Sequence, residues 1–411
     1  MNYVEIAAPF FIASMGVEYL YGVVVGKQTY RFSDTVNSLS LGVISRLVEL
    51  LKLSFSAVVF SSLAGLAGVE QWSMNAWWLW AIAFVAYDFC YYWKHRFGHE
   101  SKLFWASHVA HHQSEEFNLS TALRQTGTDY IGFVFYIPLY LIGVPAEAVI
   151  TVGSLNLIYQ FWVHTEHIRR LGPLEWLFIT PSNHRVHHAR NPDYLDKNYG
   201  GVFIVWDRLF GTFQAERSDE PCVYGITTGL RSWNPIWANC HFWWQTAKVS
   251  YCTHHWRDKI LVWFKGPGWW PDDAKPPKMA DWRYPKFDVP LRSLTKWYVF
   301  IQFWLLTAGT LWVLPQQNDL SRILAVLLFL WFAFSLYVCG QFLEGRIAAV
   351  RLEWTRLFMG VALAAGLLMF WPGQLSTAPY VLTSYSLVSA LFMIAMNKFA
   401  TGLRLASTEA E

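Results

Sequence analysis

The sequence predicts an all-α, multi-pass membrane protein with a histidine-rich site for two metal ions that faces the cytoplasm. The 411-residue chain is 54% hydrophobic and only 15% charged, whereas globular chains carry about 25% charged residues. Several apolar runs approach the ~20 residues that a helix needs to cross a bilayer. Ten of the 13 histidines fall into three groups with the spacing of metal ligands.

The apolar runs set the expected domain organisation. Gly143-Val144-Pro145 separates two short runs, which form either two spans or one re-entrant hairpin, because neighbours can satisfy an interrupted backbone. We expect N-terminal membrane helices over 1–74, a catalytic domain over 75–296 and C-terminal membrane helices over 297–411. The nine candidate spans are 4–25, 47–67, 76–93, 129–142, 147–163, 297–315, 323–340, 355–372 and 379–397.

Lysine and arginine set the expected orientation, because loops rich in these residues stay on the cytoplasmic side of a membrane. They follow the first and third runs, as at Lys27 and Lys94, whereas the loop over 68–75 has none. The N-terminus is therefore expected outside and the C-terminus inside, with 94–125 and 164–296 both cytoplasmic. The membrane is either a bacterial inner membrane or the endoplasmic reticulum.

Composition also narrows the partners. A net charge of +3, with no basic block, argues against a nucleic acid. The 24 tryptophans suit a membrane interface, where Trp and Tyr concentrate. The five cysteines are odd in number and lack paired zinc spacing, so we expect reduced thiols and not a disulfide framework.

The histidine groups predict a two-metal centre. Residues three or four apart share one face of a helix, and neutral imidazole is a common ligand for zinc, copper, iron and nickel. A single zinc site needs only three or four ligands, so this many histidines indicate two metals. The three groups contain His95, His99, His108, His111, His112, His164, His167, His184, His187 and His188.

Three carboxylates are candidates to support the metals. Asp88 lies near the end of an apolar run, where ionisable groups are costly and tend to be functional. Metal-bound histidines usually donate their second N–H to a carboxylate or a carbonyl. Asp88 and Glu100 are therefore the expected catalytic acids, and Glu166 is a third candidate to orient a histidine. Alternatively, these acids are interfacial and pair with Arg96 or Arg169.

The order of the histidines on a multi-pass membrane chain resembles the fatty acid hydroxylase/sterol desaturase superfamily. The flanking sequence resembles the alkylglycerol monooxygenase branch, whose members cleave ether lipids. The stretches that carry the resemblance lie between residues 75 and 270: Tyr91–Trp93, Asn118–Gln125, Tyr159–Glu166, Leu171–Glu175, Thr180–Ser182, Asp196–Tyr199, Trp206–Phe213 and Lys265–Trp269.

The resemblance implies two iron ions, O2 as oxidant and tetrahydrobiopterin as electron donor. Two positions depart from the branch. His167 stands where the branch has an apolar residue and stays an open tenth candidate, and Asn183 stands where the branch has a histidine. By analogy the metal ligands are His95, His99, His108, His111, His112, His164, His184, His187 and His188.

The resemblance also implies a reaction. A monooxygenase of this branch hydroxylates the ether-adjacent carbon of an alkylglycerol, and the resulting hemiacetal separates into a fatty aldehyde and glycerol. The alternative is a di-iron sterol, fatty acyl or carotenoid hydroxylase or desaturase with a ferredoxin-type or cytochrome-type electron-donor protein. A remote alternative is a non-enzymatic metal-binding membrane protein, although transport sites are expected near the bilayer midplane.

Overall fold

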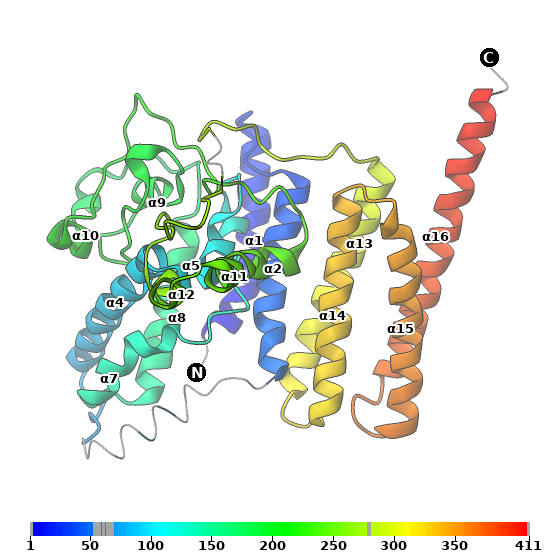
Figure 1. Ribbon diagram of the computed structural model, residues 1–411. Coiled ribbons are helices and arrows are strands. Elements are labelled where there is room, and N and C mark those ends of the chain that lie inside the picture. Colours follow the sequence, from blue (N-terminus) through cyan, green and yellow to red (C-terminus); the bar gives the residue numbers. More distant parts are fainter. Residues whose placement is uncertain (1–2, 52–58, 60–61, 63–69, 278–280, 409–411) are drawn as a thin grey trace. The chain divides into compact units, whose positions relative to one another are not determined.

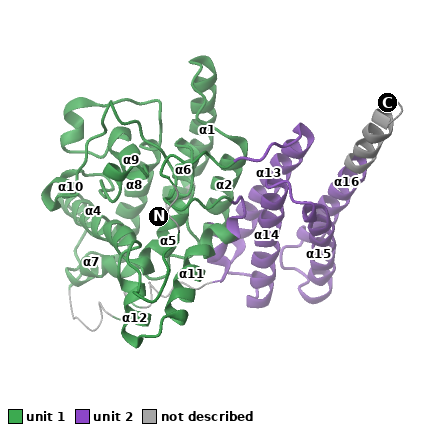
Figure 2. Cartoon of the chain, turned by 45° about the horizontal axis from the view of Figure 1, so that its top comes forward, with its two compact units in different colours: residues 1–45, 53–231, 237–287 green, residues 46–52, 232–236, 288–411 purple. Residues whose placement is uncertain are grey.

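The computed structural model describes residues 3–51, 59, 62, 70–277 and 281–408. Within these ranges the protein is helical (Figure 1), and β-structure is limited to the isolated bridges Phe178–Phe203 and Ala189–Tyr224. The predicted all-α class is therefore confirmed. The chain forms two compact units (Figure 2): unit 1 contains residues 1–45, 53–231 and 237–287, and unit 2 contains residues 46–52, 232–236 and 288–411.

Unit 1 holds the first group of helices, apart from a few terminal residues of α2 and α11. These are α1 (Tyr3–Val24), α2 (Phe32–Leu47), α4 (Trp77–Glu100), α5 (Lys102–His112), α6 (Leu119–Ala122), η2 (Gly132–Tyr136), α7 (Ile137–Leu141), α8 (Ala146–Trp162), η3 (Gly172–Trp176), α9 (Pro181–His188), η4 (Pro192–Tyr194), α10 (Val205–Phe210), α11 (Pro235–Cys252) and α12 (Trp256–Phe264).

Unit 2 holds the remaining helices. These are η1 (Val48–Leu51), α13 (Ser293–Val313), η5 (Leu314–Gln316), α14 (Arg322–Leu343), α15 (Ala348–Phe370) and α16 (Ala378–Thr408).

Five helices of the described chain are long and apolar enough to cross a membrane, which makes this a multi-pass integral membrane protein. They agree with the first predicted run and the last four. The predicted run 47–67 falls mostly outside the described residues. The five segments are Ile6–Val24, Ser293–Gln316, Arg322–Leu343, Ala348–Phe370 and Ala378–Ala395.

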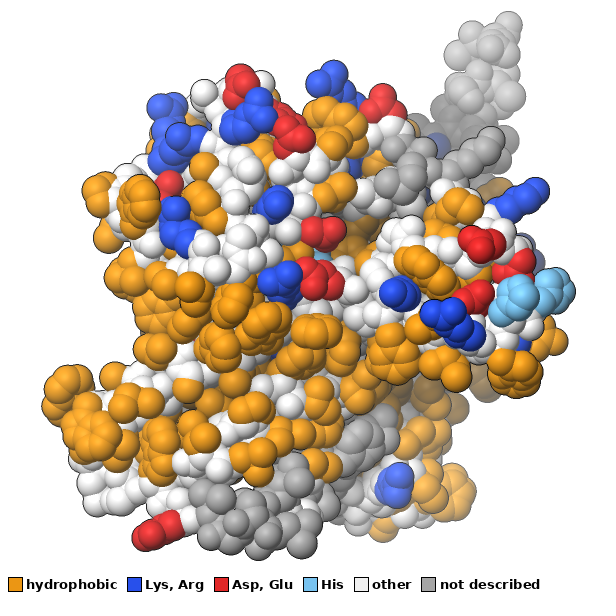
Figure 3. Space-filling model, turned by 60° about the vertical axis from the view of Figure 1, so that its left-hand side comes forward, with side chains coloured by type: hydrophobic (Ala, Val, Ile, Leu, Met, Phe, Trp, Pro, Cys, Tyr) orange, Lys and Arg blue, Asp and Glu red, His pale blue; other side chains and the backbone are white. Residues whose placement is uncertain are grey.

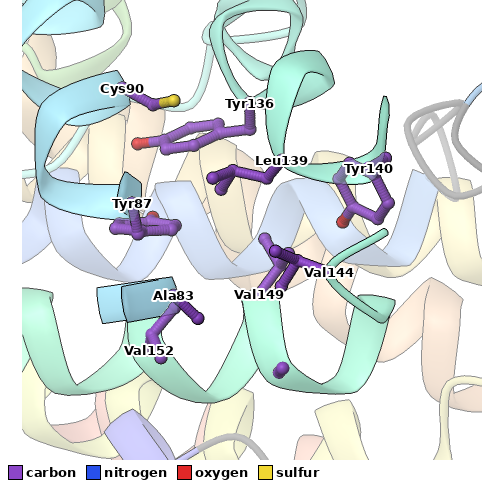
Figure 4. Close-up of a cluster of buried hydrophobic side chains, with 10 residues drawn as sticks. Ala83, Tyr87, Cys90, Tyr136, Leu139, Tyr140, Val144, Val149 and Val152 are labelled. Carbon is purple, nitrogen blue, oxygen red and sulfur yellow. The ribbon is translucent and has the colours of Figure 1, made fainter. Parts of the chain in front are cut away.

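The predicted runs 129–142 and 147–163 form a short hairpin. Its first arm, Gly132–Leu141, has 10 residues, about half the length that a span needs. The turn at Gly143 has a φ of +94°, which favours glycine. Figure 4 shows the two arms packed against α4, where the rings of Tyr87 and Tyr136 stack with centroids 4.6 Å apart. The hairpin alternative therefore describes this region better than two full spans.

The helix α4 covers the predicted run 76–93 and has an outward face of large apolar side chains. Trp77 is 80% exposed and Trp78 is 50% exposed, while Asp88, His95 and His99 on the same helix are buried. Large apolar side chains thus face outward and polar side chains face inward, as expected of a helix that contacts lipid. On the face shown in Figure 3, hydrophobic side chains form a broad band beside a region where charged side chains gather.

The N-terminal helix belongs to the same unit as the histidines. It packs against α8 and α6, and the rings of Phe11 and Phe161 stack with centroids 4.1 Å apart. The first helix therefore completes the core around α8 within unit 1.

The loops that follow α1, α5 and α8 meet at one end of unit 1. Lys27 Nζ lies 2.8 Å from Glu166 Oε2, and Arg31 pairs with Glu115 and Glu116. At the other end of α8, Trp72 N donates to Gly143 O at 2.8 Å. The positively charged loops that were predicted to share one side of the membrane are thus close together.

This arrangement predicts the sidedness of three exposed positions. Cysteines introduced at Lys27 and Asp193 should react with an impermeant thiol reagent from the same side, and a cysteine at Glu70 should react only from the opposite side. Cys240 and Cys252, which are exposed, are first replaced by Ser. Reaction of Lys27→Cys and Asp193→Cys from opposite sides would contradict the shared orientation.

Candidate metal centre

Nine buried or half-buried histidines converge in two groups, and they are the nine that the resemblance implied. Within each group the candidate ligand atoms all lie within 4.8 Å of one another. His167, the open tenth candidate, is in neither group. The first group contains His95, His99, His108, His112 and His187, and the second contains His111, His164, His184 and His188.

The helices α5 and α9 each contribute to both groups. On α5, His108 and His112 are one turn apart and join the first group, while His111 lies on another face and joins the second. The groups adjoin, because the ring centroids of His112 and His188 are only 4.4 Å apart. Two ions held this way would be neighbours in one centre.

A capping box with Thr180 as its N-cap fixes the start of α9 at Pro181. Pro181 occupies the first turn, and the side chains of Thr180 and Asn183 exchange hydrogen bonds with each other's backbone. Asn183, which departs from the family pattern, is therefore a capping residue. Its carbonyl also accepts from Asn198 Nδ2 at 2.9 Å, which links the helix to the following loop.

Backbone carbonyls fix the tautomers of four histidines. A carbonyl oxygen can only accept, so each Nδ1 carries the proton and each Nε2 presents a lone pair. The four Nδ1 donations are His95 to Tyr199 O at 2.8 Å, His187 to Lys197 O at 2.9 Å, His111 to Arg124 O at 2.9 Å and His164 to Gln160 O at 2.7 Å.

The facing nitrogens fit a metal ion better than they fit each other. His111 Nε2 and His164 Nε2 are 3.3 Å apart, and neither has a proton to share because both protons are on Nδ1. Two nitrogens that bind one metal at about 2.1 Å lie roughly 3 Å apart when they are adjacent ligands. His187 Nε2 is also buried without a partner. The donor set therefore suits a transition metal that takes imidazole.

Burial keeps these imidazoles neutral. Burial, with smaller effects of the Arg124 charge and the His99 ring, lowers the pKa of His111 to about 4. Neutral imidazole is the form that binds metal, so the centre is ready for cations at neutral pH. Burial, together with the neighbouring imidazoles, holds the pKa well below its usual range for His95, His108, His112, His164, His184, His187 and His188.

One short loop, 196–199, serves the first group. Its carbonyls at Lys197 and Tyr199 accept from two histidines. Asp196 and Asn198 have φ values of +58° and +57°, the left-handed conformation that Asp and Asn adopt more readily than most residues. This backbone conformation directs the carbonyls of Lys197 and Tyr199 toward the histidine rings.

Two buried carboxylates hold this loop and its continuation. Asp207 accepts from Tyr199 N at 2.7 Å and from Gly200 N at 2.8 Å, and burial raises its pKa to about 6. Asp88 accepts from Val202 N at 2.8 Å and from Trp206 Nε1 at 2.9 Å. A Cβ at Gly201 would lie 2.8 Å from Asp88 Oδ1, so glycine permits the close approach to α4.

The three acids expected to support the metals make other contacts. Asp88 acts on the loop and not on a ring, Glu100 pairs with Arg96 at 2.9 Å, and Glu166 pairs with Lys27 and accepts from the Tyr224 hydroxyl. The expectation that these three carboxylates accept directly from the histidines is therefore corrected. Four of the nine histidines donate to backbone carbonyls instead. A different carboxylate, that of Asp196, lies 3.5 Å from His99 Nδ1.

Arg124 is a residue that sequence reasoning did not single out as functional. It is 1% exposed, and burial lowers its pKa to about 10. Its guanidinium donates to Ala110 O at 2.6 Å and to Asn37 Oδ1 at 2.9 Å, while its own carbonyl accepts from His111. The resemblance included this stretch, but only the fold reveals that its backbone fixes a histidine.

Comparisons with known proteins agree with this centre. A family model described as fatty acid hydroxylase matches residues 80–212. The chain is 38% identical to alkylglycerol monooxygenase of Homo sapiens over 87% of this chain and 81% of that protein. It is 36% identical to alkylglycerol monooxygenase of Danio rerio over 86% of this chain and 80% of that protein. No solved structure matches.

A more distant relative acts on another lipid. The chain is 30% identical to ornithine lipid hydroxylase OlsE of Rhizobium tropici, over 38% of this chain and 48% of that protein. The relatives are thus named as monooxygenases or hydroxylases of lipids, and the histidine centre lies in the part of the chain that the family model matches.

The left-handed backbone at Asn198 can be tested with two substitutions. Asn198→Gly and Asn198→Ala both remove the side-chain hydrogen bonds, but only Ala resists a positive φ, by about 1–2 kcal/mol. We expect Asn198→Ala to bind metal roughly 5- to 30-fold more weakly than Asn198→Gly. Metal titration followed by elemental analysis measures this difference, and equal affinities would show that the loop conformation does not control the centre.

Proposed function

We propose that this chain hydroxylates the ether-adjacent carbon of alkylglycerols, because it belongs to the alkylglycerol monooxygenase family. The family membership makes the chain a membrane lipid monooxygenase, and therefore an oxidoreductase. The proposal adds the substrate, the metal and the reductant. The observation that carries it is the convergence of nine imidazoles in two adjacent groups with unprotonated nitrogens facing inward.

We propose one iron ion in each histidine group. The all-nitrogen donor set suits iron but also zinc, copper and nickel, so the choice of iron rests on the family. When bound, the two irons supply the O2 activation and hydrogen abstraction that no side chain provides. The protein's own contribution is a dry site in which carbonyls hold each ring in one tautomer and one orientation.

The reaction balances with one external two-electron donor. One oxygen atom of O2 enters the C–H bond and the other leaves as water, which takes up two electrons and two protons from the reductant. The C–O bond of the hemiacetal then breaks, and its hydroxyl proton passes to the departing glycerol oxygen. The products are a fatty aldehyde and glycerol.

Tetrahydrobiopterin is the proposed reductant on family membership alone. The buried acids Glu115 and Glu116 do not fit as its carboxylate partners, because they are already paired with Arg31 and Lys286. A ferredoxin-type or cytochrome-type donor protein is the alternative.

We infer a cytoplasmic location for the centre. Lys27 and Arg31 pair with acids at the histidine end of unit 1, and cationic loops remain on the cytoplasmic side. A lipid with a polar head and a buried tail would meet such a centre at the membrane interface. The positional labelling of exposed cysteines tests this inference.

A product assay tests the substrate and the reductant together. The purified chain, loaded with ferrous iron, is given an alkylglycerol and O2 with or without tetrahydrobiopterin. We expect fatty aldehyde and glycerol only when all components are present, because hydroxylation at the ether carbon makes the ether bond unstable. A hydroxylated product that keeps its ether bond would contradict the proposal and favour a hydroxylase related to the ornithine lipid enzyme.

Loss of one ligand should empty the second group. In His111→Ala or His188→Ala the remaining imidazoles cannot complete a site, so metal content and activity should both fall while the helical content is retained. Elemental analysis gives the metal per chain and circular dichroism the helicity. A wild-type chain with full activity and one tightly bound ion would contradict the two-metal proposal.

Substitutions of His164 and His167 test which of these two histidines binds a metal ion. His164→Ala should abolish activity, because His164 belongs to the second group. His167 lies against Tyr21, with ring centroids 5.1 Å apart, so His167→Ala should keep both metals and lower activity by no more than about 10–100-fold. Loss of a metal ion in His167→Ala would make that histidine a ligand.

A further inference from the structure

Unit 2 buries an ion pair inside helices that are apolar enough to cross a bilayer. Glu353 and Arg356 lie one turn apart on α15 and are each 1% exposed, and Arg356 Nε donates to Glu353 Oε2 at 2.8 Å. A buried ion pair is weak evidence of stability, since apolar residues can often replace it. Ionisable groups inside membrane spans mark functional sites by default.

The pair is the centre of a polar network that joins three helices. From α13, Tyr298 donates to Glu353, and Gln302 Oε1 accepts from Arg356 at 3.0 Å. From α16, Tyr385 accepts from Arg356 and donates to Gln302. The charges of the pair cancel, so the network presents hydrogen-bonding groups without a net charge.

A cavity of about 570 Å³ lies between α13 and α16. Along the chain, α13 packs on α14, α14 on α15 and α15 on α16, an order that Figure 1 also shows. The apolar part of the cavity wall includes Ile301 and Leu305 of α13 and Val381, Val388 and Phe392 of α16. Its volume is that of a site for a small molecule.

The polar network forms part of the cavity wall. Gln302, Tyr385 and Ser389 all line the cavity, and Gln302 Nε2 donates to Ser389 Oγ at 2.9 Å. The Ser389 oxygen therefore accepts one hydrogen bond and still has its own O–H to donate. Along α16 the wall extends from Tyr380 to Phe392, which is about 18 Å of helix.

We propose that this cavity is a lipid site for one alkyl chain with an uncharged terminal oxygen, such as a long-chain alcohol or aldehyde. The chain lies along the apolar wall, and the oxygen accepts the hydrogen bond that Ser389 offers. A carboxylate or phosphate is disfavoured, because the positive charge of Arg356 is already matched by Glu353. All of these residues belong to unit 2, so the site is independent of the histidine centre.

A photoreactive lipid tests the proposal on the full chain. Hexadecanol with a terminal diazirine is photolysed in nanodiscs that contain the protein, and mass spectrometry maps the labelled peptides. Val388→Trp fills the cavity, whereas Leu387→Trp is a matched control, because Leu387 is a similarly exposed neighbour on α16 that does not line the cavity. Ser389→Ala removes the proposed hydroxyl donor, and thermal unfolding verifies that each variant is folded.

We expect labels on α13 and α16, reduced in Val388→Trp by about tenfold, the effect of losing roughly two buried methylenes, and unchanged in Leu387→Trp. Unlabelled hexadecanol and hexadecanal should both compete, and Ser389→Ala should weaken that competition. Equal competition by added phosphatidylcholine would identify ordinary bilayer lipid and overturn the proposal. Labels spread equally over all exposed helices, or equal labelling of both tryptophan variants, would also overturn it.

Discussion

The centre of unit 1 depends on unprotonated imidazole nitrogens that face one another in a buried volume. His111 and His164 point their lone pairs at each other across 3.3 Å, an arrangement that is repulsive without a cation between or beside them. The protein must therefore hold each ring through its second nitrogen, Nδ1. Backbone carbonyls do this through the opposite ring nitrogen, and the surrounding fold keeps those carbonyls in place.

The support for these carbonyls explains residues that otherwise have no connection to metal chemistry. Asp207 and Asp88 hold the loop that carries the Tyr199 carbonyl, and Arg124 uses its guanidinium to anchor the backbone that accepts from His111. These three charged side chains are almost fully buried. Their charged groups bond to the backbone and to polar side chains around the centre and not to the histidine rings.

Histidine spacing predicted ten candidate ligands and the resemblance implied nine of them, but neither predicted how these histidines divide into two groups. Pairs four apart, such as His108 with His112 and His184 with His188, share a group as a helix requires. His111 joins the other group because the fold places His164, which follows α8, and His188 of α9 beside it. The sequence also suggested carboxylates as partners of the rings, whereas backbone carbonyls accept from four of them. The direction of a backbone carbonyl depends on the fold and cannot be inferred from a residue pattern.

The membrane spans show a similar limit. The predicted run 355–372 began after Glu353 and included Arg356. In the structure α15 begins at Ala348, since Glu353 and Arg356 neutralise each other and hydrogen-bond to neighbouring helices. A hydropathy window cannot detect this pairing of charged residues, so the predicted run began later than the helix does.

The two units bury polar groups by opposite means, and this difference bears on what each can bind. In unit 2 the charges cancel within the protein, so the network suits an uncharged partner. In unit 1 the inward-facing groups are neutral bases, so positive charge can come only from outside. Two divalent cations would bring charge that nine imidazoles cannot offset. The carboxylate of Asp196, 3.5 Å from His99, is the acidic group on the ring side of the loop. The left-handed backbone conformation of Asp196 places this negative charge beside the first histidine group.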